Sequence, residues 1–216
     1  MTRGERGHPV FAAYYDRLGR LAERGPMADR RRSLLVQAIG VTIEIGAGTG
    51  LNALHYPRSV SKVIATEPDP HMLRRLRDAV ASAPVPILVE RAGAEELPLE
   101  DGTADTAVVT LVLCSVPDQA EALREIRRVL KPGGRLLFLE HVRAETPRLA
   151  RWQDRLERPW GFFGGGCHPN RETEVAIRGG GFDIVEIERF GMPGVPVVRP
   201  HISGAAVARP LVGRTA

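Results

Sequence analysis

The stretch Glu44-Ile-Gly46-Ala-Gly48-Thr-Gly50 follows an alternating apolar segment at 41–45 and decides the fold. Its glycines predict a tight turn at a strand end, where the backbone approaches a ligand closely and side chains would obstruct it. The spacing is GxGxG. It does not complete the dinucleotide-binding fingerprint GxGxxG, because Leu51 stands where the third glycine is required. The turn therefore argues against a nicotinamide-dependent oxidoreductase.

Two acidic residues accompany the glycines. Glu44 lies inside the strand, where a purely structural buried strand favours Val, Ile or Leu. A carboxylate there needs a cationic partner, such as the amino group of a bound methionine moiety. Glu67 ends the next strand, at 62–66, and can accept hydrogen bonds from both hydroxyls of a ribose, worth about 1.5–3 kcal/mol each. The alternative is that Glu67 is a surface acid that starts a turn before Pro68.

Strand-like and helical patterns alternate along the rest of the chain. This alternation predicts a parallel sheet covered on both faces, with right-handed crossovers. We expect helices at 70–80 and 119–130 and one more between the strands at 41–45 and 62–66. The further strands are expected at 87–90, 107–113, 135–140, 182–188 and 201–207. The predicted fold class is α/β: a Rossmann-like, doubly wound, mostly parallel sheet in three αβα layers, with a C-terminal antiparallel strand.

The length of 216 residues favours one domain with one core. Within the single domain 1–216 we expect four parts in chain order. These are an N-terminal helical cap at 1–40, a cofactor-binding core at 41–142, a substrate loop and helix at 143–181, and C-terminal strands at 182–216.

Composition narrows the function classes. The net charge is +4, but the arginines are interspersed with acids and are not interleaved with aromatic residues, which argues against a nucleic-acid partner. No apolar run approaches the ~20 residues of a membrane span, and the N-terminus lacks the apolar stretch of a secretory signal, so we expect a cytoplasmic protein without an integral membrane segment. Cys114 and Cys167 form no CxxC pair, so neither a disulfide framework nor a metal site is predicted.

Several motifs in order resemble class I methyltransferases of the methyltransferase-11 type. They are the glycine turn, Glu67-Pro-Asp69, Gly93-Ala-Glu-Glu-Leu-Pro98, the strand 108–113, and Leu123 to Gly134 with its Lys131-Pro-Gly-Gly ending. The resemblance implies S-adenosylmethionine as cofactor. It implies that Gly46 to Gly50 pass the methionine and ribose, that Glu67 holds the ribose hydroxyls, and that Met72 packs on the adenine. It also implies that Ala94 and Glu95 contact the adenine amine. The remaining expected cofactor residues are Ala47, Pro68, Thr110 and Leu111.

The second half of the chain resembles the methyltransferase-like 7 family, whose better-understood animal members methylate alkyl thiols. The likeness rests on Thr110-Leu-Val-Leu-Cys-Ser-Val116, Glu140-His-Val142, Gly166-Cys167 with Asn170-Arg-Glu-Thr173, and Val198-Arg-Pro-His-Ile202. The sequence departs from those members by lacking their apolar N-terminal anchor and by carrying Gly161-Phe-Phe-Gly-Gly-Gly166 where the substrate loop is expected. A thiol is therefore the first candidate acceptor, and an oxygen or nitrogen of a lipid, quinone or secondary metabolite is the alternative.

Candidate acceptor-side residues lie outside the strand-helix core. His141 is the candidate base, because ligands in such folds sit at strand carboxyl ends and an unperturbed histidine titrates near pH 6.5. Each candidate also has a structural explanation: the tyrosines and the tryptophan can belong to the core, and Cys167 can be an inert buried thiol. The candidate substrate residues are Tyr14, Tyr15, Trp160, Cys167 and His168.

Overall fold

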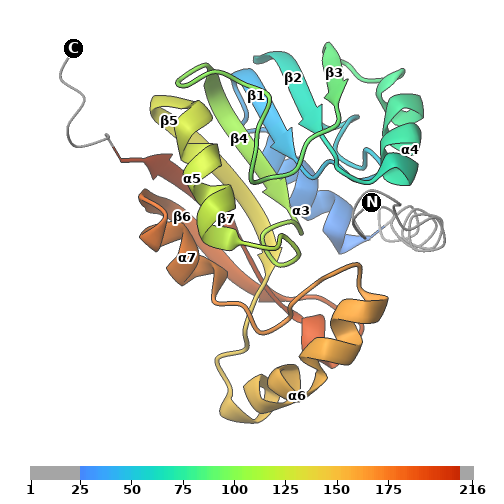
Figure 1. Ribbon diagram of the computed structural model, residues 1–216, viewed down its shortest axis with the longest axis vertical. Helices are drawn as coiled ribbons and strands as arrows, with labels where there is room; N and C mark the ends of the chain where they lie inside the picture. The colour runs from blue at the N-terminus through green and yellow to red at the C-terminus, as the bar shows by residue number, and fades with distance from the viewer. Residues whose placement is uncertain (1–24, 210–216) are drawn as a thin grey trace.

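The computed structural model describes residues 25–209 (Figure 1). The first part of the expected helical cap, with Tyr14 and Tyr15, lies outside the described residues. No helix of residues 25–209 is both long enough and apolar enough to cross a membrane.

One sheet organises the described residues. Its seven strands lie in the order β3-β2-β1-β4-β5-β7-β6, and β7 runs antiparallel to both of its neighbours while β1 to β5 are parallel. The predicted antiparallel closure by the C-terminal strands is therefore confirmed. The strands are β1 (Gly40–Ile45), β2 (Val60–Thr66), β3 (Ile87–Glu90), β4 (Ala104–Thr110), β5 (Leu130–His141), β6 (Phe182–Gly191) and β7 (Pro200–Ala208).

Helices cover both faces of the sheet, which confirms the three-layer α/β prediction. The helices α5 (Gln119–Val129) and α7 (Thr173–Gly179) pack on one face. The opposite face is covered by α3 (Pro26–Leu35) and α4 (Pro70–Val80). The remaining helix, α6 (Pro147–Phe163), lies beyond the carboxyl ends of the parallel strands and packs against the short helix η1 (Pro196–Val198) (Figure 1).

Strand β5 carries apolar side chains on both of its faces, so it requires a layer of helices on each side of the sheet. Its side chains alternate between the two cores: Leu136 and Phe138 join the α5 side, whereas Leu137 and Leu139 join the α3 side, and all four are fully buried. A strand that is apolar on both faces is stable only in the middle of a sandwich of helices, where each such side chain contributes about 1.5–3 kcal/mol.

The connection from β1 to β2 differs from the expected helix. It is a series of tight turns, closed by hydrogen bonds from Gly50 N to Ala47 O, from Ala53 N to Gly50 O and from His55 N to Asn52 O. Gly48 and Gly50 adopt positive φ angles of 59° and 85°, which a regular right-handed helix cannot contain. The predicted helix was therefore wrong because the glycines shape the whole connection.

Strand β4 ends at Thr110, three residues earlier than the apolar run 107–113 suggested. Leu111 has a φ of 60°, which turns the chain out of the sheet, and its N–H still donates to Leu139 O at 2.8 Å. A bulky residue in this conformation is strained and persists only where the surroundings impose it. The turn after Thr110 brings residues 112–114 to the end of β5.

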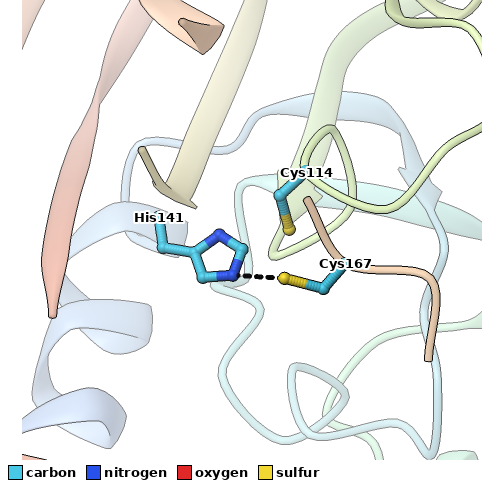
Figure 2. Close-up of side chains that lie close together, drawn as sticks. All are labelled: Cys114, His141 and Cys167. Atoms are coloured by element: carbon cyan, nitrogen blue, oxygen red, sulfur yellow. Dashed lines mark hydrogen bonds between the residues drawn. The ribbon is translucent and has the colours of Figure 1, made fainter. Parts of the chain in front are cut away.

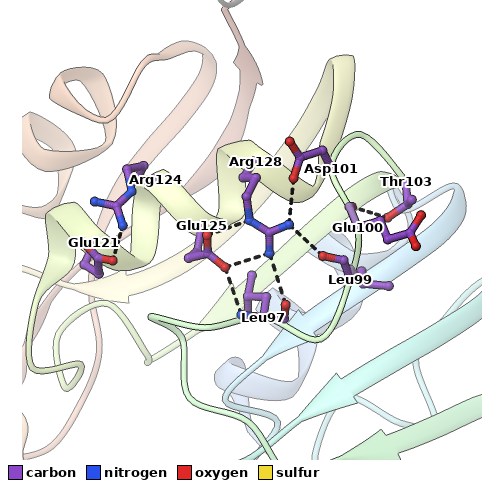
Figure 3. A network of polar contacts seen from close by, with 9 residues as sticks. All are labelled: Leu97, Leu99, Glu100, Asp101, Thr103, Glu121, Arg124, Glu125 and Arg128. Carbon is purple, nitrogen blue, oxygen red and sulfur yellow. Dashed lines mark hydrogen bonds and ion pairs between the residues drawn. The ribbon is translucent and has the colours of Figure 1, made fainter.

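A polar network fixes the loop between β3 and β4 (Figure 3). From α5, Arg128 donates to the carbonyl oxygens of Leu97 and Leu99 and to Asp101, while Glu125 accepts from the N–H of Leu97 at 3.0 Å. The hydrogen bonds from Arg128 also lower the pKa of the Glu125 carboxyl. The network thus holds the loop segment that carries Ala94 and Glu95.

Candidate cofactor and acceptor site

The predicted cofactor residues lie along one edge of the sheet. The glycine turn follows β1, Glu67 and Pro68 follow β2, the loop with Ala94 and Glu95 follows β3, and Thr110 ends β4. Because these four strands are parallel neighbours, their carboxyl ends face the same side of the molecule. The topology therefore brings together residues that are far apart in sequence.

The glycine turn leaves no room for side chains. A Cβ atom on Gly46 would lie 2.8 Å from Val112 Cγ2, and one on Gly50 would lie 2.7 Å from Ala79 Cβ. Both glycines also have positive φ angles. The prediction that this turn requires glycine is therefore supported by space as well as by backbone conformation.

Glu67 is 5% exposed and hydrogen bonds to the turn beside it. Its Oε2 accepts from Gly48 N, and its Oε1 accepts from Asp69 N, both at 2.9 Å. Burial raises the pKa of the Glu67 carboxyl to about 7, against the opposing effect of these two N–H donors. Glu67 is thus a buried acid at the strand end and not a solvated surface residue.

Glu44 belongs to a buried polar network under the same turn. Its carboxylate accepts from Asn52 Nδ2 at 2.9 Å and from the Tyr56 hydroxyl at 2.7 Å. Arg31 of α3 donates to Asn52 Oδ1 and to Thr110 Oγ1. Glu44 therefore ties the turn to α3 and to the end of β4, although burial raises the pKa of its carboxyl.

The loop after β3 presents an acceptor atom to the same edge. Glu95 Oε1 is buried and has no hydrogen-bond partner within residues 25–209, while Ala94 next to it is buried. A buried carboxylate oxygen without a partner is costly, so a bound donor is expected to satisfy it. Met72, on α4 after Glu67, is also buried.

A second group of side chains meets where β4 and β5 end. Cys114, His141 and Cys167, here called the sulfur–imidazole cluster, place their ligand atoms within 4.8 Å of one another (Figure 2). His141 Nε2 lies 2.8 Å from Cys167 Sγ, and His141 Nδ1 is buried without a hydrogen-bond partner among the described residues. The two cysteines, unrelated by spacing, are thus neighbours in space.

The electrostatics of this cluster favour a thiolate beside an imidazolium. Burial disfavours a thiolate, yet the pKa of the Cys114 thiol is well below its usual range because of hydrogen bonding with Cys167 and the charge of His141. The pKa of the Cys167 thiol is raised, first by its contact with Cys114 and then by burial. Burial opposes a charged His141, but the Cys114 thiolate and Glu140 outweigh it and raise the pKa of His141 to about 9.

Glu140 is a positioning residue that the sequence interpretation did not single out. It is fully buried, and its carboxylate accepts from the backbone N–H groups of Val112, Leu113 and Cys114 at 2.9, 3.0 and 3.3 Å. These bonds hold the strained turn after β4. An acid directly before His141 in an otherwise apolar strand was the available sequence signal.

The remaining acceptor-side candidates separate in the structure. Trp160 joins the cluster, because its Nε1 donates to Cys167 Sγ at 3.1 Å. The side chain of His168 instead contacts Glu157 of α6, with 2.8 Å between His168 Nδ1 and Glu157 Oε1. Asn170 lies before α7, whose N-cap is Glu172, and its side-chain amide donates to Asp154.

An apolar groove opens next to the cluster. It has a volume of about 600 Å³ and almost no polar surface, and Trp160 lies both in its wall and against Cys167. Volumes of this size are typical of small-molecule sites. The groove is lined by Leu149, Trp152, Leu156, Pro159, Trp160, Val195, Pro196 and Val197.

Solved structures share this fold. An S-adenosylmethionine-dependent methyltransferase of Thermotoga maritima, described as a possible histamine N-methyltransferase, has a TM-score of 0.65 at 24% identity and covers 93% of this chain and 98% of that one. An S-adenosylmethionine-dependent methyltransferase of Mesorhizobium loti has a TM-score of 0.59 at 22% identity, with coverage of 83% and 96%. At these identities the likeness establishes the fold.

Sequence comparisons identify the family as well as the fold. A family described as "Methyltransferase domain" matches residues 43–138. Thiol S-methyltransferase TMT1B of Homo sapiens is 36% identical over 195 residues, which cover 84% of this chain and 79% of that protein. Thiol S-methyltransferase TMT1A of Homo sapiens is also 36% identical, with coverage of 76% and 69%.

The ubiquinone/menaquinone biosynthesis C-methyltransferase UbiE of Syntrophotalea carbinolica matches a smaller part, at 36% identity with 68% of this chain and 66% of that protein covered. Both human thiol S-methyltransferases match a larger share of this chain, 84% and 76%. This chain therefore belongs to the thiol S-methyltransferase family of class I methyltransferases and is an enzyme that uses S-adenosylmethionine to methylate small molecules.

Proposed function

We propose that this enzyme methylates the sulfur of a small apolar thiol. The observation that carries the proposal is the apolar groove at Trp160, because the same tryptophan donates its N–H to Cys167 of the sulfur–imidazole cluster. An apolar chain in the groove would place its terminal sulfur near the strand ends. The relatives TMT1A and TMT1B are named as thiol S-methyltransferases, which agrees with this assignment.

The cofactor half is proposed to lie over the first four strand ends, and the residues there fit the group. Glu95 Oε1 is a buried acceptor without a protein partner among the described residues, as an adenine amine would require. Glu67 supplies a carboxylate for the ribose hydroxyls, and Glu44 supports the turn at the methionine end. The proposed cofactor residues are Glu44, Gly46, Ala47, Gly48, Gly50, Glu67, Pro68, Met72, Ala94, Glu95, Thr110 and Leu111.

The chemistry needs positioning more than proton transfer. Bound S-adenosylmethionine supplies an electrophilic methyl group on a positively charged sulfonium, and orienting an acceptor in line with it can contribute on the order of 7–11 kcal/mol. A free thiol ionises near pH 8.5, so a site that modestly stabilises the thiolate produces the nucleophile at neutral pH. We propose that His141 acts on the acceptor thiol. Its ring lies at the end of β5, and its Nδ1 is buried without a hydrogen-bond partner in residues 25–209.

The partners proposed are small molecules and not nucleic acid. Many arginines of the described chain are already paired with acids: Arg128 with Asp101 and Glu125, and Arg143 with Asp154.

We also propose that the whole chain forms one domain, with Tyr14, Tyr15, Trp160, Cys167 and His168 near the acceptor. The two free cysteines fit a reducing compartment such as the cytoplasm.

A comparison of acceptors tests the thiol assignment. With S-adenosylmethionine saturating, we expect a higher kcat/KM for an alkyl thiol than for the alcohol of the same chain length or for an aromatic amine, because only the thiol ionises near neutral pH. Steady-state rates of S-adenosylhomocysteine release measure all three with the same readout. Preference for the alcohol or the amine would overturn the thiol assignment and favour an O- or N-methyltransferase.

A further inference from the structure

We propose that Cys114, His141 and Cys167 bind a divalent metal ion of the zinc class and leave a fourth coordination position open for the sulfur of the acceptor. The second half of this proposal rests on the thiol acceptor proposed above. The cluster itself is defined by atoms of the described chain alone (Figure 2).

The positions of the three ligand atoms suit such an ion. Zn–S bonds of about 2.3 Å and Zn–N bonds of about 2.1 Å place the ligand atoms of a tetrahedral site about 3.5–3.8 Å apart. The two sulfur atoms and one imidazole nitrogen lie within 4.8 Å of one another. The separation of 2.8 Å between His141 Nε2 and Cys167 Sγ must widen by less than about 1 Å to admit the ion.

The donor set selects the metal class. Two thiolates and an imidazole are soft to intermediate ligands, which favour zinc over magnesium or calcium. Three protein ligands with one open position are the arrangement of catalytic zinc sites, whereas structural sites are closed by four. Cys114, Cys167 and His141 are 1%, 5% and 7% exposed, so water competes little for the site.

Neighbouring groups hold the ligands in place. The carboxylate of Glu140 accepts the backbone N–H of Cys114, and the backbone N–H of His168 donates to the carbonyl of Cys114. Trp160 Nε1 donates to Cys167 Sγ, as donors around a metal-bound thiolate do. The ligands thus come from three separate segments that backbone hydrogen bonds tie to one another.

A divalent ion would balance the charge of two coordinating thiolates and would leave His141 as a neutral ligand. A disulfide between the two cysteines is the competing outcome, and it requires an external oxidant.

The open position explains how the acceptor becomes a nucleophile. The thiol binds through sulfur and releases its proton to solvent. Its sulfur lone pair then forms the new S–C bond to the methyl carbon, while the old bond between that carbon and the sulfonium breaks and its electron pair stays on the sulfur of S-adenosylhomocysteine. The product is a neutral thioether, a weaker ligand than the thiolate, so it leaves the ion.

Cobalt spectroscopy tests the site without relying on activity. The full chain, without a polyhistidine tag, is stripped with a chelator under reducing conditions and titrated with Co²⁺. We expect saturation near one ion per chain, with visible ligand-field bands of a tetrahedral site and a near-ultraviolet thiolate-to-cobalt band. Competition with Zn²⁺ should remove both. Cys114→Ser, Cys167→Ser and His141→Gln should each weaken binding by roughly 100-fold or more.

His71→Gln is the matched control, because His71 lies on α4 with its ring against Arg74 and outside the cluster. It should bind Co²⁺ as the unmodified chain does. Absence of the thiolate band in the folded, reduced chain would overturn the metal site, as would unchanged Co²⁺ affinity in folded Cys114→Ser and Cys167→Ser variants. Recovery of the chain as a Cys114–Cys167 disulfide that takes up no metal after reduction would overturn it too.

Adding an acceptor separates this proposal from the proposed function. An alkyl thiol should shift the ligand-field bands of the cobalt form, whereas the alcohol of equal length should not. Ligand-field bands that do not change when the thiol is added would contradict the open coordination position. Full thiol methylation by the metal-free chain would also overturn it while leaving the thiol acceptor standing. A thiol-dependent shift without any thiol methylation would support the metal site and contradict the proposed function.

Discussion

Replacing His141 with glutamine is expected to lower kcat for methylation of an alkyl thiol by about 10²- to 10⁴-fold. His141 ends β5 and contacts Cys167, so the variant removes the imidazole from the acceptor end while leaving the first four strand ends intact. The affinity for S-adenosylhomocysteine should therefore stay unchanged. Single-turnover rates with saturating thiol measure the effect on the methyl-transfer step.

The control is His71→Gln, which changes a histidine outside the cluster and should keep the unmodified rate. Circular dichroism and S-adenosylhomocysteine binding confirm that the His141 variant is folded. An unchanged kcat in the folded His141 variant would show that His141 takes no part in the methyl-transfer step. A loss of cofactor affinity equal to the loss of rate would instead mean that His141 acts on the cofactor end.

A Glu67→Ala variant is expected to bind S-adenosylhomocysteine at least about tenfold more weakly. The carboxylate is the proposed acceptor for two ribose hydroxyls, and charge-assisted hydrogen bonds are worth about 1.5–3 kcal/mol each. Equilibrium dialysis with labelled cofactor measures the change. Glu96→Ala, an exposed acid on the loop after β3, is the matched control and should bind normally.

The same carboxyl should make cofactor binding depend on pH. Burial raises the pKa of Glu67 to about 7 in the free protein, so the carboxylate is fully present only above that pH. Binding to hydroxyl donors favours the ionised form, so affinity should be constant above pH 8 and fall as the pH drops below about 7. Glu67→Gln should abolish this dependence. Equal affinity in folded Glu67→Ala would mean that Glu67 only shapes the turn at Gly48.

Local signals predicted some elements of the first half of the sheet with their observed bounds. The helix at 70–80 was predicted to the residue from its apolar face, and in the structure Asp69 caps its first turn. The strand at 87–90 was likewise predicted with its observed bounds. The glycine turn and Glu67 lie close in sequence, so the parallel topology alone was enough to place them side by side.

The acceptor end could not be read in the same way. Cys114, His141 and Cys167 come from three segments that meet only because β4 and β5 are neighbours and the chain after α6 returns to them. No spacing rule links residues brought together by such a fold. Likewise, the sequence indicated a cationic partner for Glu44, and only the structure shows that Asn52 and Tyr56 hydrogen bond to its carboxylate and that the charge of Arg31 acts on it.

Calorimetric titration of the full chain with S-adenosylhomocysteine, in parallel with NAD, tests which cofactor the glycine turn binds. We expect one S-adenosylhomocysteine to bind per chain with a micromolar Kd, a binding free energy of about −8 kcal/mol, and NAD to give no measurable heat. The GxGxG turn, the missing glycine at Leu51 and the acids Glu44 and Glu67 all lead to that result. Binding of NAD as tight as that of S-adenosylhomocysteine would contradict it.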